Sequence, residues 1–131
     1  MLRFAEVIAK MSLDQKVALL SGKDFWHTVA IEEIGLESMR LSDGPAGVRG
    51  ESFDERKPSI SLPSASTLSS TWDEGLAHQF GEVAASEAIE KEVQVVLGPT
   101  INLHRSPLGG RHFEAYSEDP FLTGKLASAF V

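Results

Sequence analysis

The sequence of 131 residues contains no cysteine, which excludes disulfide bonds, thiolate metal sites and a cysteine nucleophile. No apolar run reaches the length of about 18 residues that a transmembrane helix needs, so no membrane partner is expected. Basic residues are also scarce, since 12 Lys and Arg stand against 19 Asp and Glu and the net charge is −7. We therefore expect no nucleic-acid partner, because nucleic-acid-binding faces are basic.

A secretory signal peptide is not visible at the N-terminus either. Glu6 and Lys10 interrupt the apolar positions, and no small-residue cleavage site follows an uninterrupted apolar segment. This pattern favours a cytoplasmic protein, with a secreted protein that has lost its leader as the alternative. The hydrophobic content of 42% is sufficient for a buried core, which predicts one ordinary domain or a piece of a larger one.

The first part of the chain predicts helices followed by a short strand. Two short helices open the sequence, and the second has a capping box at Ser12 and Gln15 and a stop at Gly22. A short strand is expected at 39–42, where it runs into a segment rich in glycine. Residues 51–61 are polar and charged, which is typical of an exposed loop.

The second part repeats the alternation of helix and strand. A helix is predicted from a capping box at Thr71 and Glu74 to about Glu92. The apolar, β-branched segment 93–98 predicts a strand buried on both faces, and another helix is expected after Pro120. Strands that alternate with helices indicate an α/β fold with a parallel sheet. A complete α/β barrel takes about 250 residues, so the chain is expected to be part of one.

Both predicted strands run into loops that combine backbone breakers with charged residues. One loop is DGPAGVRG, and the other is the long segment PTINLHRSPLGGRHFEAYSEDP. Ligands of parallel α/β sheets bind at the carboxyl ends of the strands, where these loops are expected to lie. Two charged loops at one edge of the sheet are the first indication of a binding site.

Asp43 stands between a strand end and a Gly-Pro pair. Two roles fit this position about equally. The carboxylate either caps backbone N–H groups of its own turn or accepts hydrogen bonds from pairs of substrate hydroxyls. Trp72 offers a stacking surface for a sugar, but a place in the core is the simpler expectation.

Arg105 and Arg111 flank the segment SPLGG, and each offers five hydrogen-bond donors in a planar fork. For either arginine taken alone, a structural ion pair with a carboxylate of the same loop is the more common role. The available carboxylates are Glu114, Glu118 and Asp119. Arg111 is the sharper binding candidate, because the Gly-Gly pair before it lets another group approach the backbone closely.

The remaining polar residues of the long loop have structural explanations. Glu118, Asp119 and Pro120 fit the start of a helix better than a catalytic site. His104 and His112 match no zinc pattern, so we expect hydrogen bonds within the loop and no metal.

Four segments, LSGKDFWHT, LSDGPAGVRG, LPSASTLSSTWD and LGPTINLHRSPLGGRHFEAYSEDP, follow one another in a familiar order and spacing. In this respect the chain resembles the N-terminal barrel domain of glycoside hydrolase family three, and its β-glucosidase branch most. The resemblance runs from residue 12 to the end, and the last segment is long and specific. It implies an α/β fold, the N-terminal portion of a (β/α)8 TIM-type barrel, with residues 1–131 as a truncated barrel domain incomplete at its C-terminus.

The activity that this resemblance implies is that of a retaining, exo-acting β-glucosidase, which hydrolyses terminal non-reducing β-D-glucosyl residues without a cofactor. By the same resemblance, Asp43 and Arg111 bind hydroxyls of the terminal sugar. Arg105 is a weaker substrate-binding candidate at the same edge, and Arg49 belongs to the loop architecture. No residue of this chain is expected to be catalytic, because the family's nucleophile, its Lys-His pair and its acid/base Glu have no matching motif here.

Two functions follow as alternatives. Either the chain is part of an enzyme, inactive and poorly soluble alone, whose partners are a β-glucoside or oligosaccharide, the rest of the barrel and a second domain. Or it is a non-catalytic sugar-binding remnant or module. Self-contained catalysis by Glu118 and Asp119 is disfavoured, since adjacent residues of one loop rarely reach opposite sides of a scissile bond. The nucleotide sequence past codon 131 separates the first two.

Overall fold

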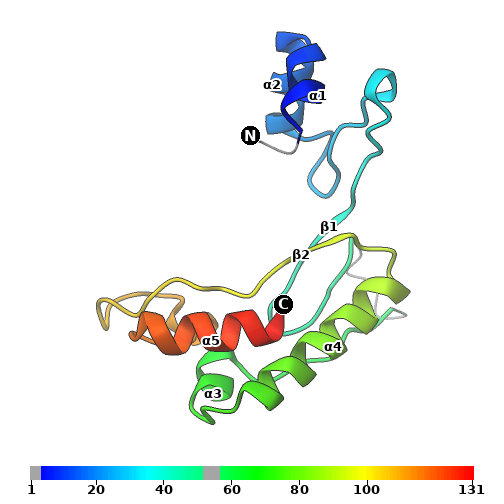
Figure 1. Ribbon diagram of the computed structural model, residues 1–131. Helices are drawn as coiled ribbons and strands as arrows, with labels where there is room; N and C mark the ends of the chain where they lie inside the picture. Colours follow the sequence, from blue (N-terminus) through cyan, green and yellow to red (C-terminus); the bar gives the residue numbers. More distant parts are fainter. Residues whose placement is uncertain (1–3, 52–56) are drawn as a thin grey trace. The chain divides into compact units, whose positions relative to one another are not determined.

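The computed structural model describes residues 4–51 and 57–131. Residues 52–56, which belong to the segment predicted as an exposed loop, lie outside the described residues. The chain divides into two compact units, Met1–Leu41 and Ser42–Val131, and each has its own internal packing (Figure 1).

The first unit begins with the two short helices that the apolar spacing predicts. Helix α1 spans Ala5–Lys10 and helix α2 spans Leu13–Ser21. The Ser12 side chain accepts a hydrogen bond from the backbone N–H of Gln15, whose side chain accepts one from the backbone N–H of Ser12. The predicted capping box is therefore confirmed, and so is the end of the helix at Gly22, which has a φ of 73°.

Beyond α2 the backbone of the first unit folds back on itself in short antiparallel pairs. Bridges join His27 to Arg40 and Ile31 to Leu36, and the second bridge encloses the 3-10 turn η1 at Glu32–Ile34. Ile31 is buried within this unit. The irregular segment is thus held by backbone pairing and by one apolar anchor.

The second unit is built on two helices that lie side by side (Figure 1). Helix α4 spans Glu74–Glu90, and helix α5 spans Pro120–Phe130. Their backbones are in close contact at Gly81, where an added Cβ atom would overlap the carbonyl oxygen of Phe130. Glycine at this position therefore lowers the helix propensity of α4 but permits the contact between the two helices.

Helix α5 begins as the Glu-Asp-Pro segment predicts. Asp119 is the N-cap, and its carboxylate accepts a hydrogen bond from the backbone N–H of Phe121 at 2.8 Å. Pro120 occupies the first turn, where its missing N–H group has no consequence. The structural role expected for this segment is confirmed.

The start of α4 differs from the prediction. The capping box expected at Thr71 and Glu74 is wrong, because Asp73 is the N-cap and accepts hydrogen bonds from the backbone N–H groups of Gly75 and Leu76. An ionised carboxylate is favoured over a hydroxyl at this end, where the helix dipole is positive.

A further short helix, α3, spans Ala65–Ser69 in a serine-rich segment for which no helix is predicted. Ser64 caps it, and Leu68 anchors it in the core. In the turn after α3, Trp72 has a left-handed backbone (φ 56°) and is 77% exposed. The prediction of a core position for Trp72 is therefore wrong, because its side chain is largely exposed in this turn.

Strands β1, Leu41–Asp43, and β2, Val95–Leu97, pair in a two-stranded sheet, with α3 and α4 in the connection between them. The predicted α/β alternation is confirmed. Strand β2 is not buried on both faces as predicted, since Val96 packs against an apolar cluster of the second unit but Leu97 is 50% exposed.

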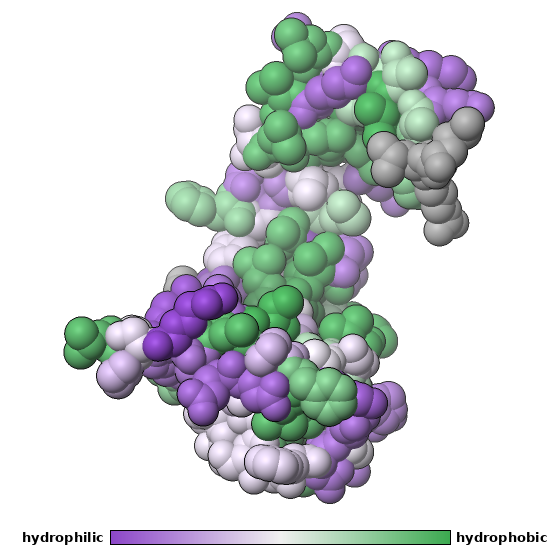
Figure 2. Space-filling model, turned by 60° about the vertical axis from the view of Figure 1, so that its left-hand side comes forward, coloured by the Kyte–Doolittle hydropathy of each residue, from purple (hydrophilic) through white to green (hydrophobic). Residues whose placement is uncertain are grey.

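Two apolar clusters form the core of the second unit. The first joins the loop after β1 to the second half of α4, and its buried residues are Val48, Ala84, Ala88 and Val93. The second joins α3, α4 and α5, and its buried residues are Leu68, Ala77, Tyr116 and Leu126. Many large apolar side chains of both units are nevertheless exposed, among them Leu20, Phe25 and Leu108. Apolar residues, drawn in green, are spread over the face seen in Figure 2. Such exposure is expected of part of a larger fold. Within 4–51 and 57–131, no helix has the length and apolar character to cross a membrane.

Candidate functional site

The loops that follow β1 and β2 meet immediately beyond the strands. A Cβ atom added at Gly98 would lie 3.1 Å from the Cα and 3.2 Å from the Cβ of Pro45. The first residues of the two loops are therefore in van der Waals contact. Asp43 directly precedes the first of these loops, and Arg111 lies further along the second.

The loop after β1 is tightly folded around two glycines. A Cβ atom at Gly44 would overlap the carbonyl oxygen of Gly47, and one at Gly47 would overlap the carbonyl oxygen of Ile60. Both residues also have positive φ angles, 124° and 152°, which side chains disfavour. This backbone path fixes where Asp43, directly before it, is held.

Asp43 lies at the end of β1, and its side chain is 56% exposed. Its Oδ2 atom accepts a hydrogen bond from Nη2 of Arg49 at 2.8 Å. Within the described part of the chain its carboxylate caps no backbone N–H, so the capping alternative does not apply there. One carboxylate oxygen is thus held by Arg49, while Oδ1 has no hydrogen-bond partner among the described residues.

Arg111 precedes the 3-10 turn η2, His112–Glu114, and forms a two-bonded ion pair with Glu114. The Nε atom donates to Oε1 at 2.8 Å, and Nη2 donates to Oε2. The hydrogen bonds and charge of Glu114 raise the pKa of Arg111, and the hydrogen bonds and charge of Arg111 lower the pKa of Glu114. Glu114 is one of the three structural partners that the sequence suggests for Arg111. It occupies one edge of the guanidinium group, and the Arg111 side chain is 79% exposed.

Asp43 and Arg111 lie within electrostatic reach of each other. After the hydrogen bond and charge of Glu114, the charge of Asp43 is the next favourable contribution to the raised pKa of Arg111. Each of the two has a partner that holds one edge of its polar group, Arg49 in one case and Glu114 in the other. Each of these two polar groups is therefore held on one side by its partner and remains accessible on the other.

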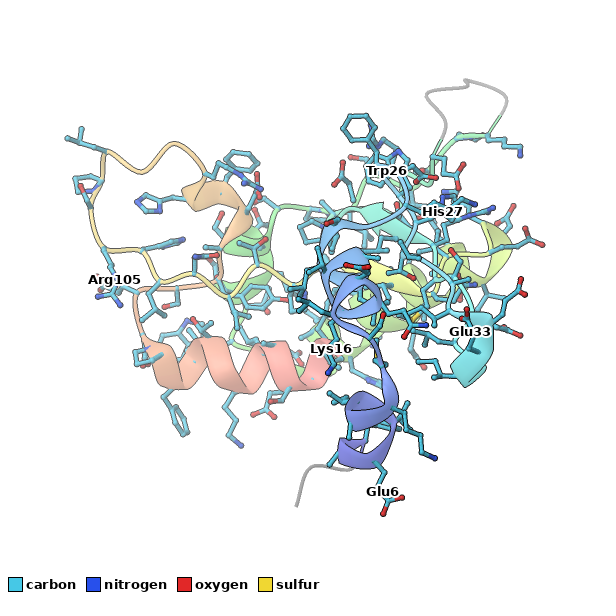
Figure 3. All side chains as sticks on the ribbon, turned by 90° about the horizontal axis from the view of Figure 1, so that it is seen from above. Glu6, Lys16, Trp26, His27, Glu33 and Arg105 are labelled. Carbon is cyan, nitrogen blue, oxygen red and sulfur yellow. The ribbon has the colours of Figure 1, made fainter. Side chains whose placement is uncertain are left out.

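Arg105 is not part of this arrangement. It is exposed on the outer side of the long loop, and its side chain points away from the ribbon (Figure 3). It makes no hydrogen bond or ion pair with any residue that the structure describes. Its assignment as a sugar ligand stays a prediction.

The two histidines of the long loop stabilise its fold. His104 Nε2 lies 2.8 Å from the carbonyl oxygen of His112 and 3.1 Å from that of Ala115, so this ring nitrogen donates. His112 Nε2 hydrogen-bonds the carbonyl oxygen of Ser106. The prediction of hydrogen bonds within the loop is confirmed. Over the described ranges, no cluster of three or more His, Cys, Asp or Glu has the arrangement of a metal site.

Glu87 of α4 is a residue of the site region that the sequence prediction missed. It is 7% exposed and binds the loop after β1 through the backbone N–H groups of Val48 and Ile60. Its position in the sequence could have indicated that it is buried, because it falls beside Ala88 on the apolar stripe of the helix, with Lys91 one turn later. A carboxylate at such a position needs buried hydrogen-bond donors.

Comparisons with known proteins identify the family to which the chain is similar. The sequence profile described as "Glycosyl hydrolase family 3 N terminal domain" matches residues 47–131. The chain is 49% identical over 125 residues to probable beta-glucosidase I of Neosartorya fischeri. The aligned residues make up 95% of the chain and 15% of that relative.

Solved structures of beta-glucosidases have the same fold over this length. The Kluyveromyces marxianus enzyme, solved in complex with glucose, is 45% identical with a TM-score of 0.85, over 96% of the chain and 15% of that enzyme. The GH3 beta-glucosidase of Bifidobacterium adolescentis is 43% identical with a TM-score of 0.81, over 95% of the chain and 18% of that enzyme. The chain therefore spans less than a fifth of the length of these relatives.

Proposed function

The chain belongs to glycosyl hydrolase family 3, and we propose that it is part of a β-glucosidase and forms part of the site that binds the terminal sugar. Its α/β elements are part of the TIM-type barrel of this family's N-terminal domain. In this proposal the partners of the chain are the rest of the barrel, a second domain and a β-glucoside or oligosaccharide.

The observation that carries the proposal is that two exposed groups of opposite charge, Asp43 and Arg111, are each held on one side by an ion pair of their own. Sugar hydroxyls donate and accept hydrogen bonds, and neighbouring hydroxyls on a pyranose do so in pairs. The open Oδ1 atom of Asp43 is an acceptor for them, and the exposed guanidinium of Arg111 is a donor. Because Arg49 and Glu114 already orient these groups, little side-chain freedom is lost when a sugar binds.

Neither Asp43 nor Arg111 performs the bond cleavage in this proposal. A retaining glycosidase needs two carboxyl groups about 5–5.5 Å apart, one that attacks and one that donates a proton. Asp43 is already paired with Arg49, and Glu114 with Arg111, so both carboxylates have a structural partner instead. Asp43 and Arg111 contribute by holding hydroxyls more tightly in the oxocarbenium-like transition state than in the bound substrate.

The test is to express the complete open reading frame that contains these residues and to assay chromogenic β-glucoside, β-xyloside and N-acetylglucosaminide substrates. We expect the β-glucoside to be hydrolysed fastest. The variant Asp43→Ala should lose about 10- to 100-fold in kcat/KM, the scale of lost charge-assisted hydrogen bonds. Asp14→Ala, which removes an exposed carboxylate of the first unit, is the control and should change kcat/KM by less than about twofold.

Three outcomes separate the alternatives. Hydrolysis that depends on Asp43 supports the enzyme. Glucose binding that depends on Asp43 but comes without turnover supports the non-catalytic sugar-binding module instead. Normal turnover by Asp43→Ala contradicts the sugar-binding role of this residue.

A further inference from the structure

Glu87 is a buried carboxylate surrounded by three hydrogen-bond donors. Its Oε2 atom accepts from the backbone N–H of Val48 at 2.9 Å, and Oε1 accepts from that of Ile60 at 2.7 Å. Burial by itself raises the pKa of Glu87, but the hydrogen bonds from Ile60 and Val48 and the ammonium of Lys91 outweigh it. The pKa lies below the ordinary value for Glu, so the group is ionised at neutral pH.

Lys91, one turn further along α4, contacts the same loop. Its Nζ atom donates to the carbonyl oxygen of Val48 at 2.5 Å, to Oγ of Ser59 at 2.7 Å and to Oε1 of Glu87 at 3.2 Å. Both backbone polar groups of Val48 are thus bound by side chains from the C-terminal end of α4, the N–H by Glu87 within the helix and the carbonyl by the C-cap residue Lys91. The Val48 side chain is also fully buried.

Val48 is directly connected to the residue that holds Asp43. Arg49 follows it in the chain and donates from Nη2 to Oδ2 of Asp43 at 2.8 Å. The loop is closed on its other side by Ser42, whose Oγ accepts a hydrogen bond from the N–H of Gly50 at 2.8 Å. The position of the Asp43 carboxylate therefore depends on where the backbone of Val48 is fixed.

From this series of contacts we propose that Glu87, together with Lys91, positions Asp43 for the sugar by clamping the backbone of Val48 to α4. The inference rests on the proposed function, in which Asp43 binds sugar hydroxyls. Glu87 is a positioning residue and not a ligand, because it is 7% exposed and both of its oxygens are engaged by the protein.

The test compares two glutamates of α4 in the complete protein. Glu87→Gln keeps the size of the side chain but replaces one acceptor oxygen by an NH2 donor, which then faces another donor. Glu90→Gln makes the same chemical change at an exposed position of the same helix and serves as the control. Both are assayed with a chromogenic β-glucoside and with D-glucose as competitive inhibitor, at a temperature at which circular dichroism shows the variants folded.

We expect Glu87→Gln to lower kcat/KM and to weaken inhibition by D-glucose, each by about tenfold, which is the scale of one displaced charge-assisted hydrogen bond. Glu90→Gln should stay within about twofold of the unsubstituted protein in both measurements. If Glu87→Gln does not fold, Lys91→Met replaces it with the same expectations, since it removes the donor to the Val48 carbonyl.

A double variant separates positioning from a general loss of stability. If Glu87 acts through Asp43, then Glu87→Gln combined with Asp43→Ala is no worse than Asp43→Ala alone. Losses that multiply, or a Glu87→Gln variant that matches the Glu90→Gln control, overturn the positioning role and leave the proposed function standing. Normal kinetics of Asp43→Ala alone would instead overturn the proposed function, and the positioning role with it.

Discussion

Replacement of Gly81 by alanine tests the packing on which the second unit is built. Gly81 lies inside α4, and Gly124 lies inside α5. A Cβ atom at position 81 would overlap the backbone of Phe130, whereas one at position 124 would meet no atom within 4 Å. The two glycines therefore form a matched pair, alike in helix propensity and opposite in surroundings.

The expected free energies of unfolding follow from this difference. In the interior of a helix, alanine is more favourable than glycine by about 1 kcal/mol. Gly124→Ala should therefore stabilise the protein by about 1 kcal/mol. Gly81→Ala gains the same amount but forces α5 away from α4, and overpacking of this kind destabilises by about 1–3 kcal/mol or more. Gly81→Ala should thus be less stable than Gly124→Ala by about 1–3 kcal/mol.

Urea unfolding, followed by the circular dichroism of the helices, measures this difference from the midpoints of the two variants and the unsubstituted protein. A lower midpoint for Gly81→Ala and a higher one for Gly124→Ala support the close contact of α4 with α5. If both substitutions stabilise the protein equally, the backbone of Phe130 does not lie against position 81, and the packing described here is refuted.

Three further results are expected. Glu114→Gln removes the charge that orients Arg111, so KM for a β-glucoside should rise by about 3- to 10-fold while the urea midpoint hardly moves, since Arg111 is exposed and such pairs contribute little to stability. The unsubstituted protein should be more stable than Glu87→Gln, and this difference should be complete above about pH 4.3. It should disappear as the pH falls through the depressed pKa of Glu87, because only the ionised carboxylate is stabilised in the folded protein. Melting temperatures of both proteins across this pH range measure the difference. Asp119→Ala removes the cap of α5 and should lower the free energy of unfolding by about 1 kcal/mol in urea.

Local signals in the sequence predict the parts of the fold that depend on neighbouring residues. The capping box at Ser12, the stop at Gly22 and the helix start at Asp119 are all found where the sequence predicts them. Each depends on backbone groups within a few residues, which the sequence shows directly. The same holds for the histidine contacts within the long loop.

Features that depend on the conformation of a turn or on distant parts of the chain were not predictable in this way. Trp72 is a large aromatic residue of the kind usually found in a core, but a left-handed turn between two helices leaves it exposed. Asp73 replaces Thr71 as the cap of α4, because the turn after α3 determines which residue precedes the helix. Glu87 looks like an ordinary charge on a helix until the loop that covers it is known.

The candidate site combines both kinds of information. The sequence places Asp43 and Arg111 on loops after two strands, and it suggests Glu114 as a structural partner of Arg111. The tertiary structure adds the contact between the loops at Pro45 and Gly98 and the ion pairs that hold Asp43 and Arg111. The partner of Asp43, Arg49, follows from the tight glycine turn, which the sequence indicates only as an irregular segment.

The most direct test of the central claim is a crystal structure of the complete protein with D-glucose bound. We expect one glucose whose neighbouring hydroxyls lie within hydrogen-bond distance of Oδ1 of Asp43 and of the guanidinium of Arg111, with the ion pairs to Arg49 and Glu114 intact. A glucose bound in the barrel without contact to either residue would contradict the proposed sugar-binding role of Asp43 and Arg111.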